Sequence, residues 1–119
     1  MQVIETKSKR EKVRKVSALM NSIGNQIGSV WFHKRSNGEL RKIAFRNHVT
    51  KPQYEKEPTG EKFLYKKAKD AEKDLRTIFD CNVLRYNNKG KLCGRGAYKS
   101  LPLDGVVRLK VGGVIYRFI

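Results

Sequence analysis

Residues 106–119 read VVRLKVGGVIYRFI, two short apolar-rich runs separated by a pair of glycines. Gly112-Gly113 predicts a two-residue hairpin turn, because both central residues of a type I′ turn need a positive φ that glycine adopts without strain. The apolar face of this hairpin holds Val107, Leu109, Val111, Val114, Tyr116 and Phe118, and the other face holds Arg108, Lys110, Ile115 and Arg117. Arg108 is set opposite Arg117, and either a bound anion or splaying of both side chains into water relieves their repulsion.

A second hairpin is predicted at residues 29–47, which read SVWFHKRSNGELRKIAFRN. Asn37-Gly38 is a strong signal for a two-residue turn, which would place Ser36 opposite Glu39. Aliphatic and Phe side chains then share one face, and the only Trp of the chain shares the other face with cations. The predicted pairs are Val30 with Phe45, Phe32 with Ile43, Ser29 with Arg46, Trp31 with Ala44, His33 with Lys42, and Arg35 with Leu40.

An amphipathic helix is predicted ahead of the hairpins, over residues 8–23. Ser8 and Glu11 have capping-box spacing, apolar residues recur at helical spacing between them and the end of the segment, and Gly24 is placed to stop the helix. The other faces of this helix carry the cations Arg10, Arg14 and Lys15. Residues 1–7 are expected to form a flexible tail, although two apolar residues in it can pair or pack.

The rest of the chain is predicted to contain further strands and one insertion. Residues 76–83 (RTIFDCNV) and 97–101 have strand character, and residues 52–74 indicate a charged loop or short helix inserted into the fold. Residues 89–96 (KGKLCGRG) are glycine-rich, and glycine lets a backbone approach a phosphate closely. We expect a basic loop here that touches a polyanion through Lys89, Lys91 and Arg95. A flexible hairpin connection is the alternative.

The charge of the chain is its strongest global property. The 119 residues carry 27 Lys and Arg against 11 Asp and Glu, a net charge of +16. A field of one sign on this scale attracts polyanions, nucleic acid first and an anionic membrane surface or an acidic protein next. A role in solubility alone is the alternative explanation.

The length favours one domain that spans residues 1–119. We recognise no signal peptide, and no apolar run is long enough for a transmembrane helix. We therefore expect a cytoplasmic protein, in which Cys81 and Cys93 are reduced. The number of short strands suits a small antiparallel barrel over residues 27–119, because closure of a sheet hides its edges.

The order of these segments resembles small phage-encoded proteins with an SH3-like β-barrel fold. The resemblance is carried by the helix ending in Gly24-Asn25, the hairpin leading into Val49-Thr50-Lys51, the segment from Tyr98 to Asp104, and the terminal Tyr116-Arg117-Phe118. It departs at residues 52–74 and 83–95. The resemblance implies a mainly β fold with an N-terminal helix and an SH3-like barrel, a bacteriophage origin and location in the host cell cytoplasm. Its motifs are structural, and it implies no activity.

No enzyme is predicted, and neither a catalytic site, a metal site nor a cofactor is expected. The four residues that zinc prefers, His33, His48, Cys81 and Cys93, lack the close spacing of a structural site. Most acids lie in the middle of the chain, where a solvated helix explains them, so a metal-dependent nuclease is not favoured.

The sequence therefore predicts a nucleic-acid-binding protein that contacts RNA or DNA through backbone phosphates, with some aromatic stacking. The candidate residues are Trp31, His33, Arg35, Lys42, Arg46, Lys89, Lys91, Arg95, Arg108, Lys110, Arg117, Arg10, Arg14 and Lys15. Packing of Trp31 beneath the helix or beneath residues 61–74 is the structural alternative. A small basic inhibitor of a host protein, acting in host takeover or anti-defence, and a ribosome-associated protein are the functional alternatives.

Overall fold

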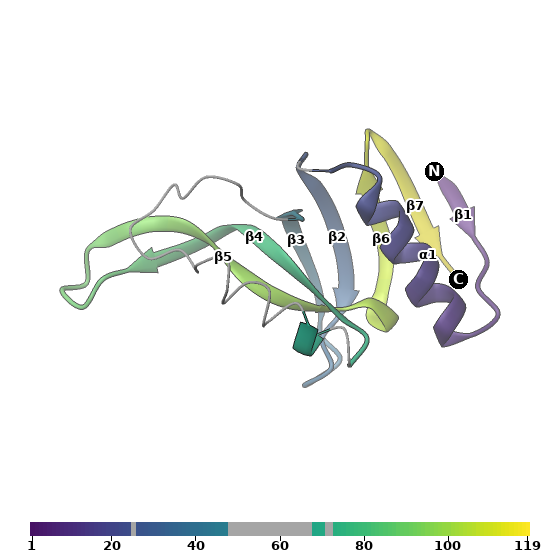
Figure 1. Ribbon diagram of the computed structural model, residues 1–119, viewed down its shortest axis with the longest axis horizontal. Helices are drawn as coiled ribbons and strands as arrows, with labels where there is room; N and C mark the ends of the chain where they lie inside the picture. The colour runs from purple at the N-terminus through teal and green to yellow at the C-terminus, as the bar shows by residue number, and fades with distance from the viewer. Residues whose placement is uncertain (25, 48–67, 71–72) are drawn as a thin grey trace.

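The computed structural model describes residues 1–24, 26–47, 68–70 and 73–119 (Figure 1). The elements in chain order are β1 (Gln2–Ile4), α1 (Lys9–Asn21), β2 (Gly28–His33), β3 (Leu40–Arg46), β4 (Leu75–Tyr86), β5 (Leu92–Pro102), the 3₁₀ turn η1 (Leu103–Gly105), β6 (Val106–Val111) and β7 (Val114–Phe118). The strands form one sheet in the order β1-β7-β6-β2-β3-β4-β5. Strand β1 is parallel to β7, and the other neighbouring pairs are antiparallel.

The sheet is open, so the predicted closure into a barrel is wrong, whereas the mainly β fold with an N-terminal helix is confirmed. Strands β1 and β5 are its two edges. Between the described residues of β3 and β4 the register holds two pairs, Phe45–Asp80 and Arg46–Phe79. Strands β4 and β5 then continue as a ribbon away from the other strands (Figure 1). At the opposite edge β1 occupies the side of β7 on which a closing strand would have to pair.

Helix α1 begins where the sequence predicts. The Ser8 side chain accepts a hydrogen bond from the backbone N–H of Glu11 at 3.1 Å, and the Glu11 carboxylate accepts one from a backbone N–H just before the helix. These bonds satisfy donors that the first turn of a helix leaves without partners. The helix ends at Asn21, and Gly24 follows with a φ of +57°. The predicted helix is confirmed, with its end two residues earlier than expected.

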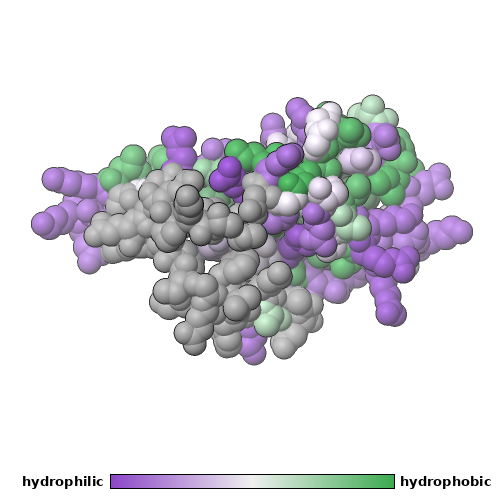
Figure 2. Space-filling view, turned by 45° about the horizontal axis from the view of Figure 1, so that its top comes forward, coloured by the Kyte–Doolittle hydropathy of each residue, from purple (hydrophilic) through white to green (hydrophobic). Residues whose placement is uncertain are grey.

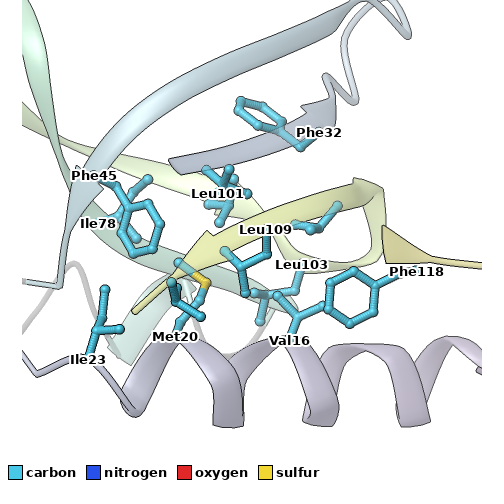
Figure 3. Close-up of a cluster of buried hydrophobic side chains, with 13 residues drawn as sticks. Val16, Met20, Ile23, Phe32, Phe45, Ile78, Leu101, Leu103, Leu109 and Phe118 are labelled. Atoms are coloured by element: carbon cyan, nitrogen blue, oxygen red, sulfur yellow. The ribbon is translucent and has the colours of Figure 1, made fainter. Parts of the chain in front are cut away.

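The apolar face of α1 covers one face of the sheet, and the core lies between them (Figures 1 and 3). Val16 and Met20 of α1 are fully buried there, and burial of a side chain of this size stabilises the fold by about 1.5–3 kcal/mol. The other buried members of the core are Ile23, Val30, Phe32, Phe45, Ile78, Leu101, Leu103, Val106, Leu109, Val111 and Phe118.

Two polar side chains fasten the C-terminal end of α1 to the sheet. Asn47 donates from Nδ2 to the carbonyl oxygens of Met20 at 2.9 Å and Gly24 at 2.7 Å. A helix end leaves such carbonyls without helical partners. Arg76 of β4 donates to Asn47 Oδ1 at 2.9 Å and to Ser17 Oγ at 3.0 Å, and burial lowers the pKa of its guanidinium. The charge of Arg76 is therefore used to join α1 to β4.

The hairpin of β6 and β7 has the predicted register from Arg108 to Arg117, but the core holds Val106 in place of Val107, because the pairing of β6 with β2 shifts there. Arg108 pairs with Arg117 and Leu109 pairs with Tyr116, while Gly112 and Gly113 have φ values of +58° and +79°. Both values are positive, as a type I′ turn requires.

The hairpin of β2 and β3 has the predicted faces but a different register. Val30 pairs with Ile43 instead of Phe45, and the remaining observed pairs are Gly28 with Phe45, Ser29 with Ala44, Trp31 with Lys42, Phe32 with Arg41, and His33 with Leu40. Arg35, expected opposite Leu40, lies in the connecting turn. Because the shift is two residues, each side chain stays on its predicted face of the sheet.

The turn between β2 and β3 explains this shift. The backbone N–H of Lys34 donates to the Glu39 carbonyl at 2.9 Å, and that of Gly38 donates to the Lys34 carbonyl at 2.8 Å, so the turn is longer than two residues. Gly38 has a φ of +73°, but Asn37 does not have the positive φ that a type I′ turn needs. Instead, Asn37 Oδ1 accepts a hydrogen bond from the Glu39 N–H at 2.9 Å. This Asx-type contact stabilises the wider turn.

The first residues of the chain are part of the sheet, in place of the flexible tail expected over residues 1–7. Val3 pairs with Arg117, and Ile4 pairs with Phe118. The Thr6 N–H donates to the carbonyl of the last residue at 3.0 Å. The two ends of the described chain therefore lie side by side (Figure 1).

Strands β4 and β5 are longer than the sequence indicated. Residues 92–96, predicted as part of a basic loop, belong to β5, and the turn is confined to residues 87–91. The predicted insertion near residues 52–74 lies largely outside the described residues. Within this segment, residues 68–70 are described and are helical. In the described part of the chain, no helix combines the length and the apolar composition that crossing a membrane requires.

Candidate nucleic-acid interface

A row of basic and aromatic side chains crosses the face of the sheet opposite α1, here called the outer face. The register sets Trp31 of β2 beside Lys42 of β3 and beside Arg108 of β6, and Arg108 is paired with Arg117 of β7. Because side chains alternate along a strand, the burial of Val30 and Leu109 in the core turns their neighbours outward. We call these four residues the cationic row. With strands about 4.8 Å apart, it spans about 14 Å across four strands.

Trp31 lies between two cations of the row. Its ring centroid is 5.0 Å from Lys42 Nζ and 5.7 Å from Arg108 Cζ, both within the range of cation–π attraction. The side chain is half-buried, so part of the indole reaches solvent. Its place on the outer face excludes packing beneath α1, and the alternative involving residues 61–74 falls largely outside the described residues.

Among the described residues, no carboxylate balances the cationic row. Strands β2, β3, β6 and β7 contain neither Asp nor Glu. Lys42, Arg108 and Arg117 form no ion pair with any described residue. The opposed arginines repel each other, and an anion bound between them would stabilise the hairpin. In the part of the chain that the structure describes, this surface is therefore positive in charge.

Three other predicted residues share the outer face with the row. Lys110 is exposed and follows Arg108 by two positions on β6. His33 is exposed at the end of β2, with its ring Nδ1 3.0 Å from the Gly38 carbonyl oxygen. Arg46 is half-buried, and its Nε atom is buried without a hydrogen-bond partner. Lys110 thus extends the cationic surface, whereas Arg46 is partly withdrawn from it.

The structure does not bring the remaining predicted residues to this face. Arg35 lies in the turn after β2 and forms an ion pair with Asp104 at 2.9 Å. Arg10, Arg14 and Lys15 lie on α1, on the other side of the sheet, and Lys15 pairs with Glu11 at 2.8 Å. Lys89, Lys91 and Arg95 lie on the ribbon of β4 and β5, away from the row (Figure 1). The predicted site is therefore divided among separate surfaces.

A groove that sequence reasoning missed lies between the β2–β3 hairpin and the ribbon of β4 and β5. Its volume is about 440 Å³, and its apolar lining includes Phe32, Ile43 and Ile78. Its cationic lining consists of Lys34, Arg35, Arg41, Lys42 and Lys99. Lys99 is paired with Asp80 at 3.1 Å. No local spacing indicates this groove, because its two sides come from segments far apart in the sequence.

Titratable groups outside the row serve the fold. Burial by itself raises the pKa of Asp104, but the hydrogen bond from Arg35 and the charges of Arg35 and Lys9 outweigh it and hold that pKa below its ordinary value. Burial raises the pKa of the Cys81 thiol, which is free and thus a weak nucleophile at neutral pH. Within the described residues, no three His, Cys, Asp or Glu side chains are grouped as a metal site requires.

Comparison with protein-family models, with curated proteins and with solved structures finds no match for this chain. The resemblance to phage SH3-like proteins and the phage origin that it implies therefore stay predictions. A function has to be proposed from the chemistry of the outer face and of the surfaces around it.

Proposed function

We propose that this protein binds nucleic acid, with the cationic row as the contact surface for a single-stranded segment of RNA or DNA. The observation that carries the proposal is the position of the half-exposed Trp31 between Lys42 and Arg108, with Arg117 in line beyond them. An indole can stack on an unpaired base, and cations on both sides can neutralise the phosphates that flank it.

The shape of this surface favours a strand over a compact anion. The row is linear and crosses four strands, so phosphates can be bound at several points along it. Stacking of a base on an aromatic side chain is worth about 1–3 kcal/mol and tolerates any base. Binding of this kind depends strongly on electrostatic attraction and has little preference for sequence. It suits a protein that coats nucleic acid or competes for it.

Trp31 also supplies the test, since it is the only tryptophan of the chain. A base stacked on the indole should quench its fluorescence during titration with a single-stranded oligonucleotide. Trp31→Ala should weaken binding about five-fold to about 150-fold, and Trp31→Phe should restore part of the loss because a smaller ring still stacks. The affinities of both variants are measured by fluorescence anisotropy of a labelled oligonucleotide.

A titration without quenching, together with unchanged affinity in Trp31→Ala, would contradict the proposal. Binding to an acidic host protein is the competing outcome. Capture of one host protein in stoichiometric amount after nuclease treatment, with no affinity for oligonucleotides, would establish it instead.

A further inference from the structure

The outer part of the ribbon of β4 and β5 projects from the body of the protein. Ile78 and Leu101, nearer the body, belong to the buried cluster, but no side chain described between residues 81 and 95 does. We call residues 81–96 the arm. At about 3.3 Å per residue, Cys81 to Tyr86 alone extends about 17 Å. Among the described residues no third strand pairs with the arm. A two-stranded ribbon is at best marginally stable in isolation, so contact with another surface would stabilise it.

One face of the arm carries three exposed large apolar side chains beside Arg95, which is paired with Leu84. Leu84 and Tyr86 are two residues apart on β4, and Tyr86 is paired with Leu92 of β5, so the three side chains share a face. Their exposed fractions are 46%, 59% and 61%. Three large apolar side chains gathered in this way favour a site of interaction over an ordinary solvated surface.

The charge of the arm has one sign. Its sequence, CNVLRYNNKGKLCGRG, contains four Lys and Arg and no Asp or Glu. Lys89, Lys91 and Arg95 are exposed, and Figure 2 shows hydrophilic side chains at the outer end of the arm with hydrophobic ones beside them. A partner of this surface must therefore be anionic and must also offer apolar contacts.

The tip of the arm is preorganised. Asn87 Oδ1 accepts hydrogen bonds from the backbone N–H groups of Lys89 at 2.9 Å and Lys91 at 3.0 Å. Gly90 has a φ of +75°, and its N–H donates to the Asn87 carbonyl at 3.0 Å. The two lysine side chains therefore project from a turn of fixed conformation. Binding then costs little further conformational entropy of the backbone.

We propose that the arm inserts into the major groove of double-stranded DNA. This inference rests on the proposed function and extends it to a second surface and to a defined class of nucleic acid. The major groove of B-DNA admits a two-stranded ribbon, and thymine methyl groups there offer apolar contacts. In this arrangement Tyr86 and Leu92 face the base edges, and Lys89 and Lys91 reach phosphates on the groove walls.

The geometry separates DNA from RNA duplexes. The major groove of A-form RNA is deep and too narrow for protein side chains to read, so a ribbon with apolar side chains cannot enter it. Cations alone would bind both duplexes through their phosphates. A preference for the DNA duplex thus depends on the apolar face of the arm.

The test compares one sequence as a DNA duplex, an RNA duplex and a DNA single strand, by fluorescence anisotropy with the full chain. The DNA duplex should bind on the order of ten-fold more tightly than the RNA duplex. The double variant Tyr86→Ser with Leu92→Ser should lose that preference and keep its affinity for the single strand, which depends on Trp31. Lys89→Gln with Lys91→Gln should reduce the salt slope for DNA duplex binding by about 1.8.

The matched control is Ile27→Ser with Ile119→Ser, because these apolar side chains are equally exposed, at 59% and 55%, but lie outside the arm. It should leave the duplex preference unchanged. Equal affinity of the original chain for both duplexes, with Trp31-dependent binding of the single strand intact, overturns the arm inference alone. Absence of all nucleic-acid binding overturns both proposals.

Two further measurements cover other partners of the arm. Arm-dependent binding to phosphatidylserine-containing vesicles without a duplex preference would show that the arm contacts membranes, and would overturn the inference. Self-association in sedimentation velocity that the Tyr86→Ser, Leu92→Ser variant abolishes, again without a duplex preference, would show that a second copy covers the apolar face. Circular dichroism confirms that each variant is folded, as expected for residues outside the core.

Discussion

Removal of two arginines from the cationic row should change the salt dependence of binding by a calculable amount. The row offers three cations, Lys42, Arg108 and Arg117, to a short single-stranded oligonucleotide that contacts the row and does not reach Lys110. If each neutralises one phosphate, the slope of log affinity against log salt is about −2.1 for a single strand. A rise from about 50 to about 200 mM salt then lowers the affinity about 18-fold.

The variant Arg108→Gln with Arg117→Gln keeps one cation of the row. Its slope should be about −0.7, and the same rise in salt should lower its affinity only about three-fold. The control Arg10→Gln with Arg14→Gln removes the same net charge from α1, on the opposite side of the sheet, and should retain the slope of the original chain. Trp31→Ala should lower the affinity at every salt concentration without changing the slope, because stacking releases no counterions.

Binding is measured by anisotropy over a series of salt concentrations for all four proteins. Equal loss of slope in the α1 control and in the row variant would mean that net charge, and not the row, determines binding. A flat salt response of the original chain would refute the electrostatic reasoning itself.

Three further predictions concern stability. Asn47→Ala removes the side chain that caps α1 and should lower the free energy of unfolding by about 1–3 kcal/mol, measured with urea; a change below the error of the measurement would contradict its role as a cap. Gly96→Ala should destabilise more than Gly90→Ala, because both have a positive φ but only at Gly96 would a Cβ lie 2.2 Å from the Phe79 ring. Equal midpoints for these two variants in thermal unfolding would show that the ring moves aside without cost. Since the pKa of Asp104 is lowered in the folded protein, its contribution to stability is present above its ordinary pKa and is lost as pH falls through the folded value. Asp104→Asn should therefore flatten the fall in melting temperature below about pH 4, and an unchanged pH profile would show that another group causes it.

The parts of the fold that depend on local spacing could be predicted from the sequence. The capping of α1 by Ser8 and the turn at Gly112-Gly113 each involve residues a few positions apart, and the structure has both. The hairpin at Asn37 shows the limit of this reasoning. Asn37 can stabilise a turn by adopting a positive φ or by accepting a hydrogen bond through its side chain. Here its side chain accepts from the Glu39 N–H, and the register differs from the predicted one while the two faces stay the same.

The parts that depend on distant segments could not be predicted. Whether a sheet closes depends on how long neighbouring strands stay paired, and nothing near Phe45 indicates that the described residues of β3 and β4 share two pairs. The candidate residues were chosen for charge and for the face of a hairpin. Charge does not reveal that Arg35 pairs with Asp104 or that Lys91 lies on a projecting arm. Trp31 lies beside Arg108 because β2 pairs with β6, and this pairing could not be predicted from the sequence alone.

The pairing of β1 with β7 has a consequence for biosynthesis. The ribosome makes Phe118 more than a hundred residues after its partner Ile4. Until then the apolar side of α1 lacks the hydrophobic surface of β6 and β7, and the first residues have no strand to join. Such distant pairing slows folding. The cationic row needs Arg117 of β7, so it is complete only once this strand has joined the sheet.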